Sequence, residues 1–537
     1  MIENYEETLK LGLIRVDQKK YNESKKFFLQ LTSIDPNRYE GYLNLSNILS
    51  IENKEDEARI ILEKYLKNIN SHPEIINGLA INLFNSKNFI DLNKHIDAYL
   101  KSHNNYLLNY LKGFCLNNLN KTIEAEKFLH KAIKLNNQFW HSYELLFNIF
   151  DLRSKISEMG ELIEDARKKF YKNIKFNYFE ALYNFRISNY NYCDQILNRE
   201  SLKVYFKKNN SDNFTADYLN LLSKNYEKLS NNKKSLEHAI KRNSILVNLE
   251  KNRDVNKHEL LDTIDSYIKF FKNNIGKNFT KNYSGIEHSN LTFLVGFPRS
   301  GTTLLDTILR THSKTLVLEE KPYLINIRHD FFKKNNISKL FSLDEKNLVE
   351  MQKNYFKSFN YNADKIIIDK FPLNLIELGF IKMIFPNCKI ILALRHPLDC
   401  ILSCVLTSFK INEAMINFEN LRTTAHFYNK TFNLLETYIN FFNLNLYKIK
   451  YENVVTNFEK EILNLLSYLG LNFEDSVVNF HDTAKKREKI HTPSYHQVVK
   501  PIYKSSINRH IGFEDVSTVV DEVRGWIKHY GYDDFKI

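Results

Sequence analysis

Apolar and small residues follow a repeating pattern over the first part of the chain. A small residue recurs every 33 or 34 positions: Gly12, Ser46, Ala80 and Gly113. A second position of the pattern lies twelve residues after each of these: Ser24, Ala58, Leu92 and Ala125. This spacing predicts paired antiparallel helices, because the residues at a close helix crossing must be small.

The pattern weakens after the fourth unit. The twelve-residue spacing persists in three later pairs: Phe147 and Met159, Ala181 and Cys193, and Ser223 and Ser235. The first of these pairs is too large for the standard pattern, and the intervals between the pairs are irregular. We therefore predict about five to seven helix pairs over residues 1–245, with a helical linker over residues 246–285 that becomes polar toward its end.

The second half of the chain has a different pattern, in which short apolar runs of strand character alternate with segments at helical spacing. The runs cover residues 291–297, 365–370, 389–395 and 446–452. The helical segments include residues 304–312, 398–409 and 454–469. Strands alternating with helices predict a parallel sheet covered on both faces. Residues 286–537 are therefore expected to form an α/β domain.

A loop suited to phosphate binding follows the first of these strands. Residues 298–303 read PRSGTT and lie between the strand and a helix. A tight turn at a helix N-terminus presents backbone N–H groups to an anion. Gly301 lets the backbone approach that anion, Thr302 and Thr303 add hydroxyl donors, and Arg299 adds a planar cationic fork.

An ATP-binding P-loop is the main alternative interpretation of this loop. Gly296 and Gly301 have the glycine spacing of that motif, but Thr302 stands where the motif has the Lys that bridges the β- and γ-phosphates. The loop is therefore P-loop-like, and a Mg-ATP kinase is the less favoured hypothesis. We expect instead a nucleotide whose single 5′-phosphate carries another transferable group.

Polar side chains are expected at the carboxyl ends of the strands, where ligands bind in sheets of this type. Arg299, Lys370, Arg395 and Tyr451 all fall at such ends. Three strand-terminal cations beside a hydroxyl-rich loop predict a site for a polyanion.

Composition narrows the class of protein. The 537 residues are 43% hydrophobic and 26% charged, with only 14 Gly and 9 Pro. Such a composition is typical of a globular and largely helical chain. The net charge of +13 fits an anionic ligand or simply a solvated basic surface. Without a block of like charges, nucleic-acid binding is not expected. The acidic N-terminus and the lack of a long apolar run predict a cytoplasmic protein without a membrane span.

The cysteines and histidines give no sign of a metal site. The five cysteines form no Cys-x-x-Cys pair, so buried free thiols in a reducing compartment are expected. We see no His/Cys cluster with zinc spacing. No metal is therefore expected.

These motifs resemble two known families. The helical pattern resembles the tetratricopeptide repeat. Residues 297–305 (FPRSGTTLL) look like the 5′-phosphosulfate loop of the sulfotransferase superfamily, which uses 3′-phosphoadenosine-5′-phosphosulfate (PAPS). Arg395 with Ser403, eight residues later, looks like the pair that binds its 3′-phosphate. The resemblance implies that the loop residues Arg299, Ser300, Gly301, Thr302 and Thr303 contact PAPS.

The catalytic half is similar to the tyrosylprotein sulfotransferases in further positions. Glu320 follows the loop arginine at the spacing where that family has its general base, and Lys370 matches the lysine that stabilises the leaving group. The likeness implies that Arg299 assists them in catalysis. The resemblance also implies four further cofactor contacts: Tyr451, Ser494, Lys500 and Arg509. The last of these is a Lys in the family.

Departures from the family concern the acceptor and the base. Pro322 stands where the eukaryotic enzymes have an Arg near the acceptor peptide. Pro372 stands where cytosolic sulfotransferases have a catalytic His, which favours Glu320 as the base. His312 and His396 are alternatives, although packing or capping is the commoner role of such histidines. Glu319 either assists Glu320 or faces solvent.

The resemblance thus predicts a helical repeat solenoid joined to a PAPS-dependent sulfotransferase with protein tyrosine as the leading acceptor. Sulfation of a glycan or small molecule remains open. A non-enzymatic adaptor that uses the repeats is a hypothesis of another class. We expect the repeats to engage an acceptor protein or peptide, and a homodimer is a further possibility.

Overall fold

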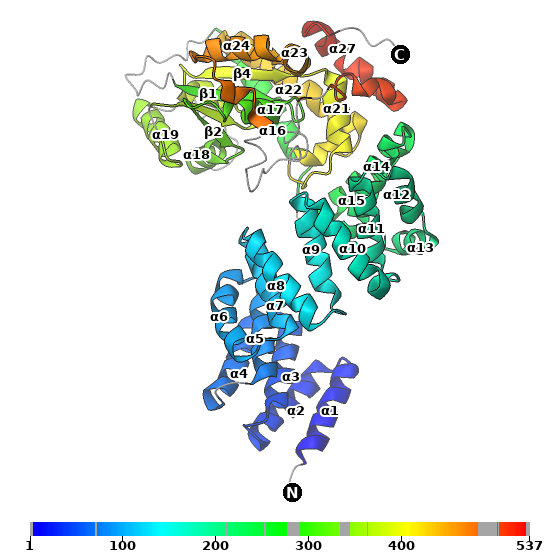
Figure 1. Ribbon diagram of the computed structural model, residues 1–537. Coiled ribbons are helices and arrows are strands. Elements are labelled where there is room, and N and C mark those ends of the chain that lie inside the picture. The colour runs from blue at the N-terminus through cyan, green and yellow to red at the C-terminus, as the bar shows by residue number, and fades with distance from the viewer. Residues whose placement is uncertain are drawn as a thin grey trace. The chain divides into compact units, whose positions relative to one another are not determined.

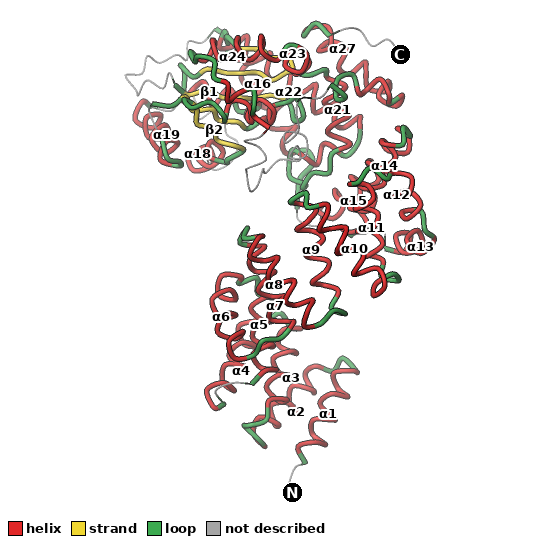
Figure 2. Tube along the Cα trace, viewed as in Figure 1, coloured by secondary structure: helices red, strands yellow, loops and turns green. Residues whose placement is uncertain are grey.

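The computed structural model describes residues 4–69, 72–209, 212–251, 254–276, 290–332, 344–361, 364–481, 502 and 504–532. Figure 1 labels its helices and strands, and Figure 2 separates helix, strand and loop. The chain forms two compact units, Met1–Leu202 and Lys203–Ile537. In the described residues, the first unit consists of helices, and the second contains a parallel sheet.

Paired helices make up the first unit. Its described residues form six consecutive pairs: α1 (Tyr5–Asp17) with α2 (Tyr21–Ile34), α3 (Tyr39–Ile51) with α4 (Glu55–Asn68), α5 (Pro73–Asn85) with α6 (Phe89–Ser102), α7 (Tyr106–Asn118) with α8 (Thr122–Leu135), α9 (Trp140–Leu152) with α10 (Ile156–Phe170), and α11 (Ile174–Arg186) with α12 (Tyr190–Leu197). This confirms the predicted helical repeat architecture.

The small residues of the repeat lie where the two helices of a pair cross. The hydroxyl of Ser24 on α2 donates a hydrogen bond of 2.8 Å to the carbonyl oxygen of Gly12 on α1. A Cβ at Gly12 would lie 2.6 Å from the ring of Phe28, so a larger residue would push the helices apart. The turn inside each pair also repeats, with one residue of positive φ: Lys19, Asn53, Lys87, Asn120, Ser154 and Ser188.

Two further helices of repeat type belong to the second unit. Helices α14 (Asn213–Lys228) and α15 (Asn232–Lys251) bring the hydroxyls of Ser223 and Ser235 to 3.4 Å of each other, as the small-residue spacing suggested. Helix α15 of this pair packs on α21 (Pro397–Leu406) of the α/β part. The compact units separate at Leu202, within the residues 1–245 that the sequence assigns to helical repeats.

Five parallel strands form the sheet of the second unit in the order β2-β3-β1-β4-β5. Their bounds are β1 (Leu291–Gly296), β2 (Thr315–Glu319), β3 (Ile366–Lys370), β4 (Lys389–Leu394) and β5 (Tyr447–Lys450). Four of them match the predicted apolar runs, and β2 was not predicted. The chain moves to one side of β1 for β2 and β3 and to the other side for β4 and β5. The carboxyl ends of β1 and β4 therefore flank the topological switch point, where ligands bind in such sheets.

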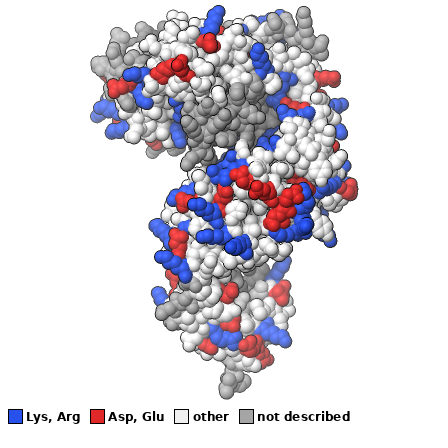
Figure 3. Space-filling view, in the orientation of Figure 1, with Lys and Arg blue, Asp and Glu red and all other residues white. Residues whose placement is uncertain are grey.

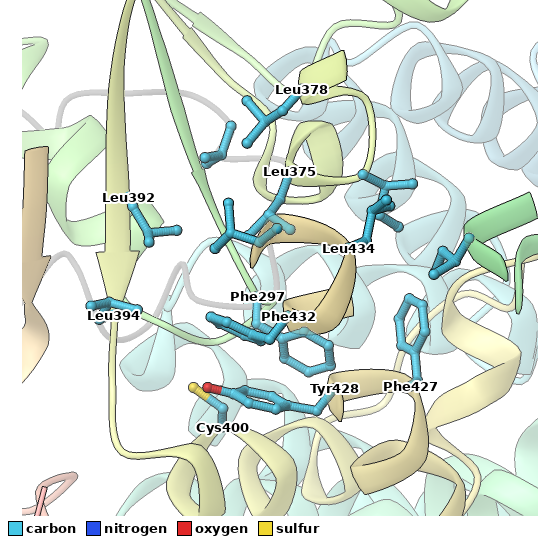
Figure 4. Close-up of a cluster of buried hydrophobic side chains, with 14 of the residues drawn as sticks. Phe297, Leu375, Leu378, Leu392, Leu394, Cys400, Phe427, Tyr428, Phe432 and Leu434 are labelled. Carbon is cyan, nitrogen blue, oxygen red and sulfur yellow. The ribbon is translucent and has the colours of Figure 1, made fainter. Parts of the chain in front are cut away.

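Helices cover both faces of this sheet. On one face, α17 (Thr302–Leu309), α23 (Tyr451–Thr456) and α24 (Phe458–Leu469) enclose a core that includes Leu294 of β1. The opposite face carries a larger core that includes Phe293 and Val295. The helices that contribute to it are α15, α16 (Glu259–Asn273), α18 (Tyr323–Phe332), α19 (Glu345–Lys357), α20 (Leu378–Ile384), α21, α22 (Leu421–Phe442) and α27 (Val520–His529). Figure 4 shows part of this core, with Phe297 beside Tyr428 and Phe432.

Short 3₁₀ turns complete the described part of the second unit. They are η2 (Pro372–Leu375), η3 (Met415–Phe418), η4 (Asp475–Val477), η5 (Arg509–Gly512) and η6 (Glu514–Val519). The single helix expected over residues 454–469 is two helices, because the backbone at Asn457 (φ −132°, ψ 49°) leaves the helical region.

Surface charge, helix hydropathy and the cysteines can each be compared with what the sequence predicted. On the face in Figure 3, acidic and basic side chains are interspersed. Across the described residues, every helix is too short or too polar to cross a bilayer. All five cysteines are buried free thiols, as predicted.

Candidate functional site

The predicted phosphate loop joins β1 to α17. Gly301 caps α17 with a φ of +98°, and Thr302 and Thr303 are the first two residues of the helix. A Cβ at Gly301 would lie 2.8 Å from the ring of Tyr451, so glycine is required by both the backbone and the space. Arg299 also has a positive φ, 72°, which is rare for a residue with a side chain. The loop thus has a strained shape of the kind that is concentrated at functional sites.

Four of the predicted nucleotide contacts lie together at the switch point. The Nε atom of Arg299 donates a hydrogen bond of 3.1 Å to the hydroxyl of Ser403 on α21. Arg395, which follows β4, donates from its guanidinium to the carbonyl oxygen of Arg299 at 3.1 Å. The same guanidinium lies over the ring of Tyr451, 5.0 Å from its centre. These contacts bring Arg299, Arg395, Ser403 and Tyr451 into one cluster beside Gly301.

Lys370 and Glu320 form a second cluster at the carboxyl ends of β3 and β2. The two strands pair with Glu319 opposite Lys370, and the backbone N–H of Glu320 donates to the carbonyl oxygen of Lys370 at 2.8 Å. Lys370 Nζ lies 2.6 Å from the Glu320 carboxylate. The lysine side chain is fully buried, while that of Glu320 is 31% exposed. Glu320 has a φ of 48°, a second strained backbone position.

Three further charged residues lie around Lys370. The sequence analysis did not assign Asp306 and Arg310 to this site, and it left the role of Glu319 open. Asp306 on α17 accepts from the guanidinium of Arg310 at 2.7 Å and lies 3.6 Å from Lys370 Nζ. Glu319 lies 3.9 Å from both Lys370 and Arg310 and is buried, so it does not face solvent. Burial raises the pKa of Asp306, and the charges of Lys370 and Arg310 oppose this increase. The four-residue spacing of Asp306 and Arg310 was the available sequence signal.

The two histidines considered as alternative bases have structural roles. His312 Nε2 lies 2.9 Å from the carbonyl oxygen of Asn472. His396 caps α21 by accepting from the backbone N–H of Leu398, and its ring stacks on His510 at 4.2 Å. Burial and the nearby His510 lower the pKa of His396 to about 4. These contacts are of the kind that packing and capping histidines make.

Three further predicted cofactor contacts, Ser494, Lys500 and Arg509, are not seen in the cluster around Arg395. Arg509 forms a bidentate ion pair with Glu227 on α14, at 2.7 and 2.6 Å. Ser494 and Lys500 lie outside the described residues. Nearby, the carbonyl oxygen of Ser506 accepts from the Arg395 guanidinium at 2.5 Å.

Asp369, the buried residue before Lys370 on β3, gives the stability of the protein a predicted pH dependence. Burial raises the pKa of Asp369 to about 7, against the opposing hydrogen bond from Tyr355 and charge of Lys370. The folded state therefore holds this proton more tightly than the unfolded chain. The free energy of unfolding should fall as pH rises from about 4 to about 7.

Asp369→Asn should remove this dependence while keeping an acceptor for the Tyr355 hydroxyl. We expect the variant to gain stability relative to the parent, on the order of 2 kcal/mol, between pH 5 and pH 8. Urea unfolding of both proteins at the two pH values measures the change. Stability profiles that stay parallel would contradict the raised pKa.

Comparison with known proteins identifies the domain around these clusters. Residues 292–475, which include the loop, Glu320, Lys370, Arg395, Ser403 and Tyr451, match the sulfotransferase family. These residues form a sulfotransferase-family domain. Residues 9–38 match the tetratricopeptide repeat.

Individual relatives of the chain are distant. An uncharacterized protein of Aquifex aeolicus (strain VF5) is 29% identical over 321 residues, which are 56% of this chain and 40% of that protein. Protein-tyrosine sulfotransferase A of Caenorhabditis elegans is 24% identical over 261 residues, 46% of this chain and 68% of that protein. The sulfotransferase domain from the curacin biosynthetic pathway is 18% identical, covers 45% of this chain and 97% of that domain, and has a TM-score of 0.34.

The chemistry of this sulfotransferase-family domain fits PAPS, the nucleotide that the family generally uses. The hydroxyl of Ser300 and the Nε atom of Arg395 are buried without a hydrogen-bond partner among the described residues. Buried polar groups normally have partners, and both of these atoms can donate to a phosphate oxygen. Within the same described part of the chain, no group of three or more His, Cys, Asp and Glu side chains could hold a metal ion.

Proposed function

We propose that the chain transfers a sulfuryl group from PAPS to an acceptor hydroxyl, with protein tyrosine as the leading acceptor. The observation that carries this proposal is the sulfotransferase-family match, whose residues include both charged clusters at the carboxyl edge of the sheet. The similarity to the nematode protein-tyrosine sulfotransferase supports tyrosine as the acceptor.

The site residues divide into two groups under this proposal. The backbone N–H groups at the start of α17, with Arg299, Ser300, Thr302 and Thr303, would hold the 5′-phosphosulfate. Arg395 and Ser403 would hold the 3′-phosphate, and Tyr451 would pack beside the nucleotide. PAPS supplies the activated sulfuryl group when it is bound.

Glu320 is the proposed general base. Its carboxylate is partly exposed, so an acceptor hydroxyl can reach it and give up a proton there. Lys370 is paired with this carboxylate at 2.6 Å and lies between Glu320 and Asp306. A buried ammonium and the Arg299 guanidinium provide fixed positive charge, which stabilises negative charge that develops on oxygen during transfer. Fixed cations of this kind can take the role that Mg²⁺ has in phosphoryl transfer.

The repeat unit is the proposed binding region for an acceptor protein. Exposed apolar side chains occur on both helices of its pairs, among them Leu13 and Ile81 on first helices and Ile90 and Ile123 on second helices. Apolar positions repeated along a solenoid suit an extended protein partner.

Transfer of labelled sulfate tests the proposal. The purified chain is incubated with PAPS that carries ³⁵S and with a lysate in which other sulfotransferases have been inactivated by heat. We expect label in protein, released by hydrolysis as tyrosine sulfate. Label in glycans or small molecules would overturn the tyrosine assignment, and no transfer to any acceptor would overturn the function.

A further inference from the structure

The helix pair α14–α15 contacts the surroundings of Arg395 and Ser403, the two residues proposed to hold the 3′-phosphate. This pair has the small-residue spacing of the repeats but lies in the same compact unit as the sheet. Its contacts reach both α21, which carries Ser403, and the segment 506–512, which contacts Arg395 and Asp399.

The first contact is a buried arginine at the C-terminus of α21. Arg242 on α15 is fully buried and donates to the carbonyl oxygens of Val405 at 2.7 Å and Leu406 at 3.2 Å. Asn243 donates to the Val405 carbonyl oxygen as well, at 2.9 Å. The last carbonyl groups of a helix have no partner within the helix and carry partial negative charge, so a cation is suited to this position.

Arg242 is costly to bury. Its hydrogen bonds to described residues all go to neutral oxygens, those of Asn220, Asn243, Val405 and Leu406. Burial lowers the pKa of Arg242 to about 9, which leaves it charged at neutral pH. A charge buried without a carboxylate partner destabilises a fold. Its two hydrogen bonds to the last carbonyl groups of α21 favour a role in fixing the position of that helix.

The C-terminal end of α21, which Arg242 and Asn243 hold, directly contacts the phosphate loop of residues 298–303. Ser403, two residues before Val405, accepts the hydrogen bond from Arg299, and the thiol of Cys404 donates to the carbonyl oxygen of Pro298 at 3.4 Å. A shift of the helix end by a fraction of an ångström would move both contacts.

The second contact holds the segment that packs on Arg395. On α14, Glu227 forms the bidentate ion pair with Arg509. Asn232, the first residue of α15, donates to the carbonyl oxygen of Gly512 at 2.6 Å. Between these anchors, His510 donates from its backbone N–H to Asp399 at 2.9 Å, and Asp399 lies 3.7 Å from the Arg395 guanidinium.

We propose that the helix pair α14–α15 positions the 3′-phosphate subsite, with Arg242 and Glu227 as its two anchoring residues. Arg242 fixes the helix that carries Ser403, and Glu227 fixes the segment that packs on Arg395. This inference rests on the proposed function, because it assumes that Arg395 and Ser403 bind a 3′-phosphate. Both anchors act through other residues and are positioning residues.

Binding of two nucleotides by variants of the full chain tests this role. Arg242→Met keeps the length of the side chain and removes its donors. We expect this variant to bind adenosine 3′,5′-bisphosphate about tenfold more weakly in calorimetric titrations. The loss for 5′-AMP should be smaller, about threefold, because the end of α21 also contacts Pro298 and Arg299 of the phosphate loop. Arg242→Lys should recover part of the loss. The control is Lys241→Met, on the exposed face of the same helix, which should change neither affinity.

Glu227→Ala provides an independent variant, because Glu227 is partly exposed and its removal leaves no buried cavity. We expect about threefold weaker binding of the bisphosphate with 5′-AMP binding retained. Equal losses for both nucleotides, or no loss in either variant, would overturn the positioning role. If the parent protein itself fails to bind the bisphosphate, the proposed function fails, and this inference fails with it.

Discussion

Arg395→Ala should weaken binding of adenosine 3′,5′-bisphosphate by roughly tenfold to a hundredfold, the size expected for loss of a charge-assisted hydrogen bond. Binding of 5′-AMP, which lacks the 3′-phosphate, should change by no more than about threefold. The physical reason is the position of Arg395, whose buried Nε lacks a partner among the described residues. Calorimetric titration with the two nucleotides measures both affinities.

Arg422→Ala is the matched control for this experiment. Arg422 is an exposed arginine on α22, so its loss makes the same change in net charge outside the site. We expect the control to bind both nucleotides like the parent. An equal loss of affinity for the two nucleotides in Arg395→Ala would exclude a specific contact with the 3′-phosphate.

Glu320→Gln should lower turnover by about 10²- to 10⁴-fold, the usual contribution of a general base. The amide has the shape of the carboxylate but cannot accept the proton. Affinity for adenosine 3′,5′-bisphosphate should stay close to that of the parent, because the nucleotide is assigned to other residues. Initial rates at saturating PAPS and acceptor separate turnover from binding.

Two controls make the Glu320 result specific. Glu459→Gln changes an exposed carboxylate on α24 and should leave turnover unchanged. Glu319→Gln changes the neighbouring carboxylate, which is buried and close to Arg310, and its effect reports on the charge network rather than on the base. Full turnover in Glu320→Gln would remove Glu320 from the mechanism.

The sequence predicted the parts of the site better than their connections. The loop, Lys370 and Arg395 are each visible as a strand followed by a cation, since both signals are local. The contact between Glu320 and Lys370 depends on β2, a five-residue strand that the hydrophobic pattern did not reveal. Strand order and register are set by contacts between distant residues, so Glu319 opposite Lys370 could be read only from the folded chain.

The helix pair α14–α15 shows a similar limit to what a sequence pattern can predict. The repeat spacing correctly indicates that Ser223 and Ser235 belong to a helix pair. It does not indicate what that pair packs against, because the small positions record only the crossing within a pair. The contact is made by Leu236 and Ala239, which join the larger core, and by Arg242 and Asn243, whose side chains reach the carbonyl oxygens of α21. Polar residues in an irregular repeat give no such signal before the contact is known.

Calorimetric titration of the unmodified chain with adenosine 3′,5′-bisphosphate, in buffer that contains a chelator, tests most directly whether the charged clusters form a metal-independent nucleotide site. We predict saturable binding of one nucleotide per chain without Mg²⁺, and much weaker binding of ATP with or without Mg²⁺. Tight binding of Mg-ATP together with no detectable binding of the bisphosphate would contradict this account.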